Sequence, residues 1–189
     1  SMRAWALVLW FMCSLASAEI GSVVDLTGTA VIKRGKETIV VIKNTQIVNE
    51  GKIIQGEVLI KNGRIEKIAS QIETKEAITE INAENQFLIP GAIDDQVHFR
   101  EPGLTHKATI YSEAKAAVAG GVTSFMEMPN TLPPVFTQTL LEDKYQIGAK
   151  NSLANYSFYM GSSQENIEEI LKTNKKKIVT TKTDDDFFN

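Results

Sequence analysis

The sequence changes its pattern at Pro90-Gly91. Before this dipeptide, from Thr38 to Ile89, short runs rich in β-branched residues follow one another with turn residues between them. After it, extended stretches alternate with helical ones, which is typical of parallel βα units. The pattern therefore predicts an α/β protein in which a β-rich layer precedes a strand–helix part.

The region before Pro90 should be a purely structural β-layer. The runs that predict its strands are 39–42, 46–48, 53–54, 57–60, 64–68, 78–81 and 86–89. Asn62-Gly63 predicts a tight hairpin, because a type I′ turn needs positive φ at both central residues. The last two runs bracket the turn-rich segment 82–85 and are expected to form a further strand pair.

The region after Pro90 predicts four strands and three helices. The strands are expected at 92–99, 122–128, 154–160 and 177–182. Gly120-Gly121 should end the first helix after Ala119, and Thr137 should cap a second helix that runs to about Lys150. Ser162 and Glu165 have the spacing of a capping box at the start of the third helix.

Four βα strands are half of a (β/α)8 barrel, and half a barrel cannot close. We therefore expect either a small open sheet or a truncated piece of something longer. The tail 183–189, with three aspartates followed by two phenylalanines, favours truncation because it resembles neither a helix start nor a regular terminus.

The N-terminal segment 1–18 has the features of a secretory signal peptide. Arg3 precedes an apolar run from Ala4 to Leu15, and Ala16-Ser17-Ala18 resembles a cleavage site. The alternative is a buried N-terminal helix. Residues 19–37 predict two short strands with turns at Gly28 and Gly35, and they resemble the start of secreted FecR-type β-domains.

Composition excludes several classes of protein. A net charge of −3 gives no basic footprint for nucleic acid, and the apolar N-terminal run is too short for a transmembrane helix. The single cysteine, Cys13, excludes a disulfide framework and a multi-cysteine zinc site. With only His98 and His106, any metal centre must also use other ligands.

The stretch 90–103 is the candidate functional segment. In an extended strand, alternate side chains point to the same face. One face would hold Asp94, Gln96, His98 and Arg100, and the other Ile93, Val97 and Phe99. Four polar groups in a row are costly to bury, so this face should meet water, a metal or an anionic ligand.

Residues from about 40 to 182 resemble dihydroorotase, of the cyclic amidohydrolase branch of the amidohydrolase superfamily. The resemblance rests on Pro-Gly-Ala-Ile-Asp at 90–94, His-Phe-Arg-Glu-Pro-Gly at 98–103, Ala-Gly-Gly-Val-Thr at 119–123 and Met-Pro-Asn-Thr at 128–131. It implies a β-rich N-terminal region at 19–89, the first half of a TIM-type barrel at 90–182, and interconversion of N-carbamoyl-aspartate and dihydroorotate in pyrimidine biosynthesis. It also implies one or two zinc ions, which activate a water for attack on the cyclic amide.

The resemblance assigns roles to individual residues. Arg100 and Asn130 match the residues that hold the substrate carboxylate, and His98 matches the second histidine of a His-x-His metal pair. Lys182 corresponds to a carbamylated lysine that bridges two metals, although an ordinary strand-end lysine is the alternative. Gln96 stands at the position of the usual first histidine, and a neutral amide is a poor zinc ligand.

The family's two later histidines and its general-base aspartate have no counterpart, so we expect no turnover from this chain alone. Two other hypotheses remain open. The chain could be a non-catalytic scaffold or assembly partner, as a homo-oligomer or beside aspartate carbamoyltransferase. It could instead be a secreted β-domain joined to amidohydrolase sequence, since the resemblance implies a cytoplasmic enzyme whereas residues 2–18 suggest export.

Overall fold

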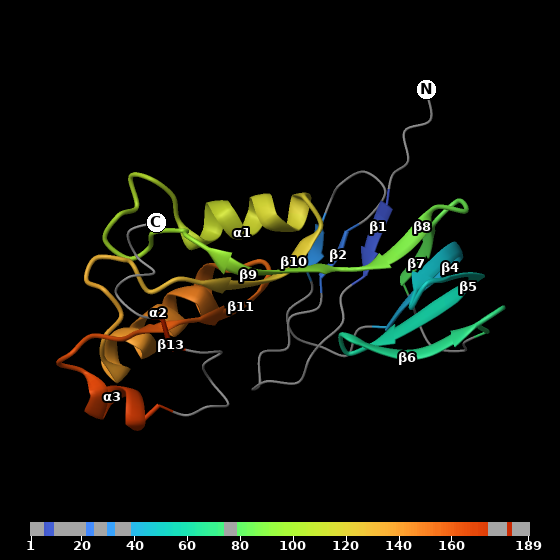
Figure 1. Cartoon of the computed structure of the whole chain (residues 1–189). Helices are drawn as coiled ribbons and strands as arrows, with labels where there is room; N and C mark the ends of the chain where they lie inside the picture. The colour runs from blue at the N-terminus through green and yellow to red at the C-terminus, as the bar shows by residue number, and fades with distance from the viewer. Residues whose placement is uncertain are drawn as a thin grey trace. The chain divides into compact units, whose positions relative to one another are not determined.

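The computed structural model describes residues 39–73 and 79–173, together with the backbone of four short strands at 6–9, 22–24, 30–32 and 181–182 (Figure 1). The described residues divide into two compact units, the first ending at Ala92 and the second beginning at Ile93. The described residues of the first unit form strands and no helix, and those of the second alternate strands with helices. The α/β class predicted from the sequence is confirmed.

The first unit contains a six-stranded sheet with the strand order β1-β8-β4-β5-β6, and β7 pairs with β4 beside this path. The strands are β1 (Ala6–Leu9), β4 (Ile39–Asn49), β5 (Lys52–Lys61), β6 (Arg64–Ala69), β7 (Thr79–Asn82) and β8 (Phe87–Pro90). Strands β4, β5 and β6 form an antiparallel meander. The β-rich layer predicted before Pro90 is therefore present.

Both turns of this meander use residues with positive φ. The predicted Asn62-Gly63 turn is confirmed, with φ of 52° and 73°. Glu50-Gly51, with φ of 50° and 73°, makes the same kind of turn between β4 and β5. Sequence pattern missed this second turn because glutamate is not among the residues that usually adopt a left-handed conformation.

Strands β7 and β8 do not form the strand pair predicted from the sequence. Both run parallel to β4, β7 beside residues 40–43 and β8 beside residues 46–47. The chain between them bends where Ala83 N donates to Lys43 O and Gln86 N donates back to Ala83 O. The turn-rich segment therefore kinks one edge of the sheet instead of reversing the chain.

The core of the first unit follows the strand period. Its buried residues are Ile42, Ile47, Val58, Ile60, Ala83 and Leu88. In β5, burial alternates from Gly56 to Ile60, as expected for a strand with one covered face. At the other end of the strand, Ile53 and Ile54 are exposed.

Of the N-terminal region, the structure describes only strands. Ala6–Leu9 forms β1, parallel to β8, so the alternative of a buried helix is wrong for these four residues. The rest of the signal-like segment 1–18 lies outside the described residues. The two short strands predicted in 19–37 are confirmed as β2 (Ser22–Val24) and β3 (Ala30–Ile32), which pair antiparallel.

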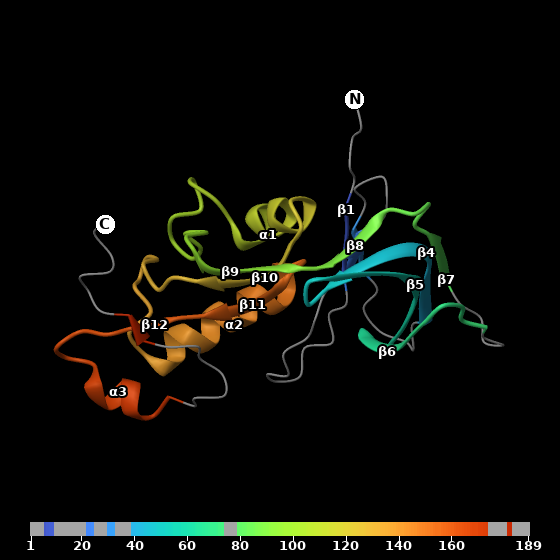
Figure 2. The ribbon, with the colours of Figure 1, turned by 45° about the vertical axis from the view of Figure 1, so that its right-hand side comes forward.

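The second unit follows the predicted strand–helix alternation (Figure 2). Its elements are β9 (Ala92–Val97), α1 (Ile110–Ala119), β10 (Val122–Glu127), α2 (Gln138–Asn151), β11 (Asn155–Phe158), β12 (Met160–Gly161), α3 (Ile167–Leu171) and β13 (Thr181–Lys182). The sheet order is β11-β10-β9, and β10 and β11 are parallel. Helix α1 contacts β10, α2 contacts β11, and the two helices contact each other, as consecutive βα units do.

Two of the predicted helix ends are confirmed. Thr137 caps α2, its hydroxyl accepting from Leu140 N at 3.2 Å. Helix α1 ends after Ala119, where Gly120 is the C-cap and Gly121 takes the positive φ of 90°.

The predicted start of the third helix is wrong. Helix α3 begins at Ile167 with Asn166 as its N-cap, so Ser162 and Glu165 lie before the helix. The reason is the near-complete burial of Asn166, whose amide donates to Phe136 O and Gly161 O, both at 2.9 Å. Leaving these two carbonyls without a hydrogen bond would cost more free energy than a capping box at Ser162 would contribute, because unpaired buried carbonyls are costly.

The final strand predicted at 177–182 is described only at Thr181–Lys182, which pairs parallel with β12. The described residues include no helix that is both long and apolar enough to cross a bilayer.

A substitution of Gly103 tests how closely two loops of the second unit pack. Gly103 has φ of 83°, and a Cβ there would clash with the backbone oxygen of Leu132. Gly103→Ala should destabilise this unit by about 3 kcal/mol, from left-handed strain plus overpacking. Hydrogen exchange of the α1 and β10 amides measures the loss.

Gly51→Ala is the matched control for Gly103→Ala. Gly51 has φ of 73° and nothing within 4 Å of an added Cβ. Gly51→Ala should cost only the conformational strain, a loss of about 1 kcal/mol in stability. Hydrogen exchange of the β4 and β5 amides measures this loss. Equal losses at the two positions would show that the close approach to Leu132 is not a real constraint.

Candidate functional site

The candidate site lies where β9 and β10 end. Strand β9 ends at Val97, so the alternation expected through Arg100 does not continue that far. Phe99 is buried against Phe125, with ring centroids 4.5 Å apart, and Arg100 has φ of 72°. The prediction that Arg100 shares a strand face with Asp94 and Gln96 is therefore wrong.

The physical reason is a carboxylate from the neighbouring strand. Glu127 Oε1 accepts from Phe99 N at 3.1 Å and from Arg100 N at 3.0 Å. Bonding two successive amides to one oxygen turns the backbone out of the strand conformation. A non-glycine residue held at positive φ costs about 1–3 kcal/mol, which the surrounding contacts must offset.

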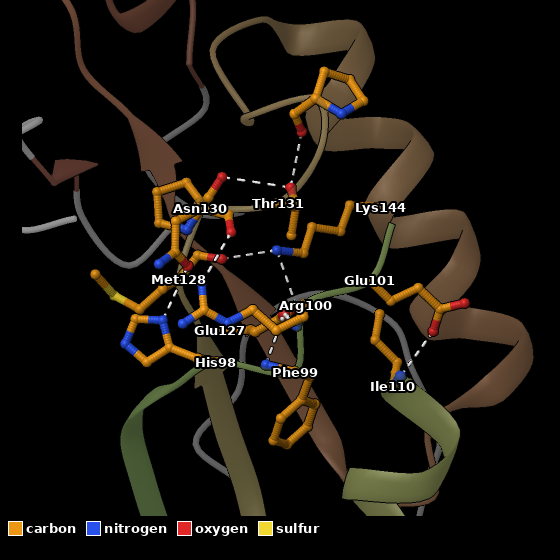
Figure 3. A network of polar contacts seen from close by, with 12 residues as sticks. His98, Phe99, Arg100, Glu101, Ile110, Glu127, Met128, Asn130, Thr131 and Lys144 are labelled. Atoms are coloured by element: carbon orange, nitrogen blue, oxygen red, sulfur yellow. Dashed lines mark hydrogen bonds and ion pairs between the residues drawn. The ribbon is translucent and has the colours of Figure 1, made fainter. Parts of the chain in front are cut away.

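The structure brings His98, Arg100 and Asn130 together, as Figure 3 shows. His98 Nδ1 lies 2.9 Å from Asn130 Oδ1. Arg100 Nη1 makes a longer contact of 3.5 Å to Asn130 O. The three residues assigned to one site by the resemblance are thus neighbours, although the chain separates Asn130 from His98 by 32 positions.

The contact with Asn130 indicates which ring nitrogen of His98 is the donor. An amide oxygen can only accept, so Nδ1 of His98 carries the proton and donates it. In a neutral imidazole, Nε2 then holds the lone pair. Among the described residues Nε2 has no recorded partner, and it is the atom that could accept a hydrogen bond or ligate a metal.

No ion pair joins the described side chains of Arg100 and Glu101, although the two residues are adjacent in the chain. Glu101 Oε2 instead accepts from Ile110 N at 2.7 Å, at the first residue of α1. A carboxylate is favourable there because it complements the N-terminal end of the helix dipole. Apart from its contact with Asn130 O, the guanidinium keeps donors for a ligand.

The loop after β10 is held by Thr131 and not by Asn130. Thr131 Oγ1 donates to Pro133 O at 2.9 Å, and Thr131 N and Val135 N both donate to Pro129 O. The turn therefore does not need the Asn130 side chain. Its amide oxygen instead faces His98, so Asn130 does more than form a turn.

A buried ion pair that the sequence pattern did not predict lies beneath the site. Lys144 Nζ, on α2, lies 3.0 Å from Glu127 Oε2 and donates to Met128 O at 2.9 Å. Both side chains are completely buried, and the ammonium lies 5.1 Å from the centre of the Phe158 ring. The available signal was the alternation in β10, which places Glu127 on the same face as buried Phe125.

Burial opposes both charges of this pair. Desolvation raises the pKa of Glu127, while the charge of Lys144 and the two backbone N–H donors act to lower it. Desolvation also lowers the pKa of Lys144, against the opposing effect of Glu127. Each charge is therefore tolerated in the interior only because the other is present.

The described residues do not by themselves form a metal centre. Within 39–73 and 79–173, no three His, Cys, Asp or Glu side chains gather closely enough to hold a metal ion. Gln96 is exposed, and its recorded contact is through the backbone N, which donates to Asp94 Oδ1 at 3.1 Å. Lys182 belongs to strand β13, and its side chain lies outside the described part of the chain.

Comparison with known proteins identifies the family. A family model described as "Dihydro-orotase-like" matches residues 85–186, more than half of the chain. The chain belongs to this family. It is 36% identical over 129 residues to the dihydroorotase of Methanosarcina acetivorans and 46% identical over 98 residues to that of Carboxydothermus hydrogenoformans. These matches cover 68% and 52% of the chain but 27% and 23% of the two enzymes, about a quarter of their length.

Solved structures agree with this family and with its barrel fold. The L-hydantoinase (dihydropyrimidinase) of Arthrobacter aurescens matches with a TM-score of 0.70 and 27% identity, over 75% of this chain and 32% of that one. A D-hydantoinase matches with a TM-score of 0.65 and 24% identity over similar shares, which supports the fold alone. The β-layer followed by barrel-type βα units, predicted from the sequence, is thereby confirmed.

Removing one partner of the buried ion pair should be strongly destabilising. Lys144→Met leaves Glu127 charged and uncompensated in the interior, which should cost about 3–5 kcal/mol. Adding Glu127→Gln removes the remaining charge and should recover most of that loss. Urea unfolding followed by circular dichroism measures both variants.

A charge-removing double variant as unstable as Lys144→Met would contradict this account. It would mean that lost packing, and not an unpaired charge, causes the destabilisation.

Proposed function

We propose that this chain provides the substrate-carboxylate side of a dihydroorotase-like cyclic amide hydrolase. The reaction adds water across the ring C–N bond of dihydroorotate to give N-carbamoyl-aspartate, and the reverse closes the ring. The observation that supports this function is the meeting of Arg100 with Asn130 and His98 at the ends of two neighbouring strands.

The polar groups left at this site suit a carboxylate. Arg100 uses one guanidinium nitrogen on Asn130 O, and its remaining donors can pair with both oxygens of a carboxylate. Asn130 Oδ1 is engaged by His98, so its amide nitrogen is the group oriented for a second donor contact. Donors converging from two loops would fix the orientation of the substrate ring.

Among the described side chains, His98 is the one through which a metal enters this proposal. A zinc ion would supply an activated water for attack on the amide carbon. His98 suits it, because its Nε2 lone pair is available while Nδ1 is oriented by Asn130. Gln96 is a weak ligand by its chemistry, and Lys182 remains a proposed carbamylated ligand. The described residues alone do not complete a metal site.

The solved neighbours raise a second candidate, because their titles name hydantoinases and dihydropyrimidinase. Arg100 favours a substrate with a carboxylate on the ring over one without. Dihydroorotate and dihydrouracil differ by that carboxylate, so the two ligands separate the candidates directly.

Replacement of Arg100 tests the carboxylate role. Arg100→Gln should weaken binding of dihydroorotate and N-carbamoyl-aspartate by about tenfold or more, the value of a charge-assisted hydrogen bond. Binding of dihydrouracil should be unaffected. Titration followed by amide NMR measures affinity without requiring turnover.

Lys107→Gln is the control for Arg100→Gln, since it removes one positive charge from the same loop. It should leave both affinities unchanged. If the chain binds dihydrouracil as tightly as dihydroorotate, the dihydroorotase assignment fails and the hydantoinase-like candidate takes its place.

A zinc titration tests the role of His98. His98→Ala should abolish zinc binding measured by equilibrium dialysis, because it removes the only imidazole of the candidate site. His106→Ala, which removes the other histidine of the chain, should retain it. Zinc binding that survives His98→Ala would contradict the assignment.

A chain that binds no zinc would favour a different function, the non-catalytic assembly partner. The exposed Gln96 and the incomplete ligand set of the described residues are what support that candidate.

A further inference from the structure

We infer that Glu127 is a positioning residue for the proposed carboxylate site, holding Arg100 in its left-handed conformation with Lys144 as its counter-charge. The choice of ligand in this inference rests on the proposed function. The contacts that hold Arg100 do not depend on it.

The two oxygens of the Glu127 carboxylate contact different parts of the second unit. One oxygen accepts from the amides of Phe99 and Arg100, and the other faces Lys144 at 3.0 Å. A single buried carboxylate thus joins the loop after β9 to helix α2. No other acceptor for these two amides is recorded among the described residues.

The positive φ of Arg100 sets the direction of its side chain. At φ of 72°, Arg100 turns away from the strand alternation, and its guanidinium reaches the carbonyl of Asn130. In an ordinary strand conformation, the side chain would continue the alternation of β9 instead. The amide bonds to Glu127 therefore decide where the positive charge of Arg100 lies.

Lys144 makes a corresponding bond to the backbone of the loop after β10. Lys144 donates to Met128 O at 2.9 Å, two residues before Asn130. The pair consequently fixes the backbone on both sides of the site, Phe99–Arg100 through Glu127 and Met128 through Lys144 (Figure 3). Both groups reach the site only through the backbone, so neither is a catalytic residue.

A pair of double variants separates positioning from mere stability. In the Lys144→Met background, Glu127→Gln keeps a side-chain oxygen for the two amides, whereas Glu127→Met removes it with little change in size. Neither leaves a buried unpaired charge. Both variants lose the bond from Lys144 to Met128 O, so the comparison between them isolates the acceptor for the two amides. The methionine variant should bind dihydroorotate about tenfold or more weakly than the glutamine variant.

Amide NMR of the same two variants reads the geometry independently of the ligand. The Phe99 and Arg100 amide protons should stay close to their wild-type positions with glutamine. With methionine they should shift, and the Arg100 amide should exchange faster, because both amides lose their acceptor. Dihydroorotate affinity and Arg100 shifts that are equal in the two variants would overturn the inference.

Two controls keep the outcome readable. Glu101→Gln changes another carboxylate in the same loop that accepts a backbone amide, that of Ile110, and should leave affinity unchanged. Val118→Ala in the buried face of α1 should lower stability without changing affinity. If Val118→Ala weakens binding as much as the methionine variant does, the effect reflects stability alone and the inference fails.

If the methionine variant does not fold, Glu127→Asp provides an alternative test. It keeps the charge opposite Lys144 but withdraws the oxygens from the amides by one methylene, so affinity should again fall; unchanged affinity would overturn the inference. If the wild-type chain binds neither dihydroorotate nor N-carbamoyl-aspartate, the proposed function fails. The Arg100 amide resonances then still test the positioning role.

Discussion

The ion pair between Glu127 and Lys144 is the interaction on which the second unit depends. Two fully buried charges would each be intolerable alone, so strand β10 and helix α2 must pack in the register that joins them. The two side chains also make hydrogen bonds to backbone groups of the two loops at the site. The site geometry is thus a consequence of satisfying buried charges.

The pair also affects the electrostatics of anion binding. Glu127 approaches the backbone of Arg100, and a lone carboxylate there would repel the carboxylate of a ligand. Lys144 cancels that charge at 3.0 Å, so the positive charge of Arg100 is not offset by the residue that orients it. A neutral amide could also accept from the amides, but it could not hold Lys144 in place.

What the sequence could predict was set by local rules and by motif spacing. The Asn62-Gly63 turn, the Thr137 cap and the helix end at Gly120 depend on neighbours in the chain, and all were correct. The resemblance to dihydroorotase brought His98, Arg100 and Asn130 to one site, and the three residues do lie together. Their roles in binding and metal ligation remain predictions.

What the sequence could not predict depends on partners distant along the chain. The alternation in β10 places Glu127 on the buried face, but its pairing with Lys144 depends on how the strand and the helix pack together. Asn166 moves the start of α3 because two distant carbonyls need its amide. Arg100 leaves the strand alternation for the same kind of reason. Each error came from applying a local pattern where a buried polar group required something else.

The close approach of Gly103 to Leu132 has a consequence for how this family can vary. Leu132 N also donates to Pro102 O, and His98 and Arg100 both contact Asn130, so the two loops are joined at several points. The helix between them can change its surface freely, but the loops cannot change separately. A chimera assembled from two relatives should therefore inherit both loops from the same parent.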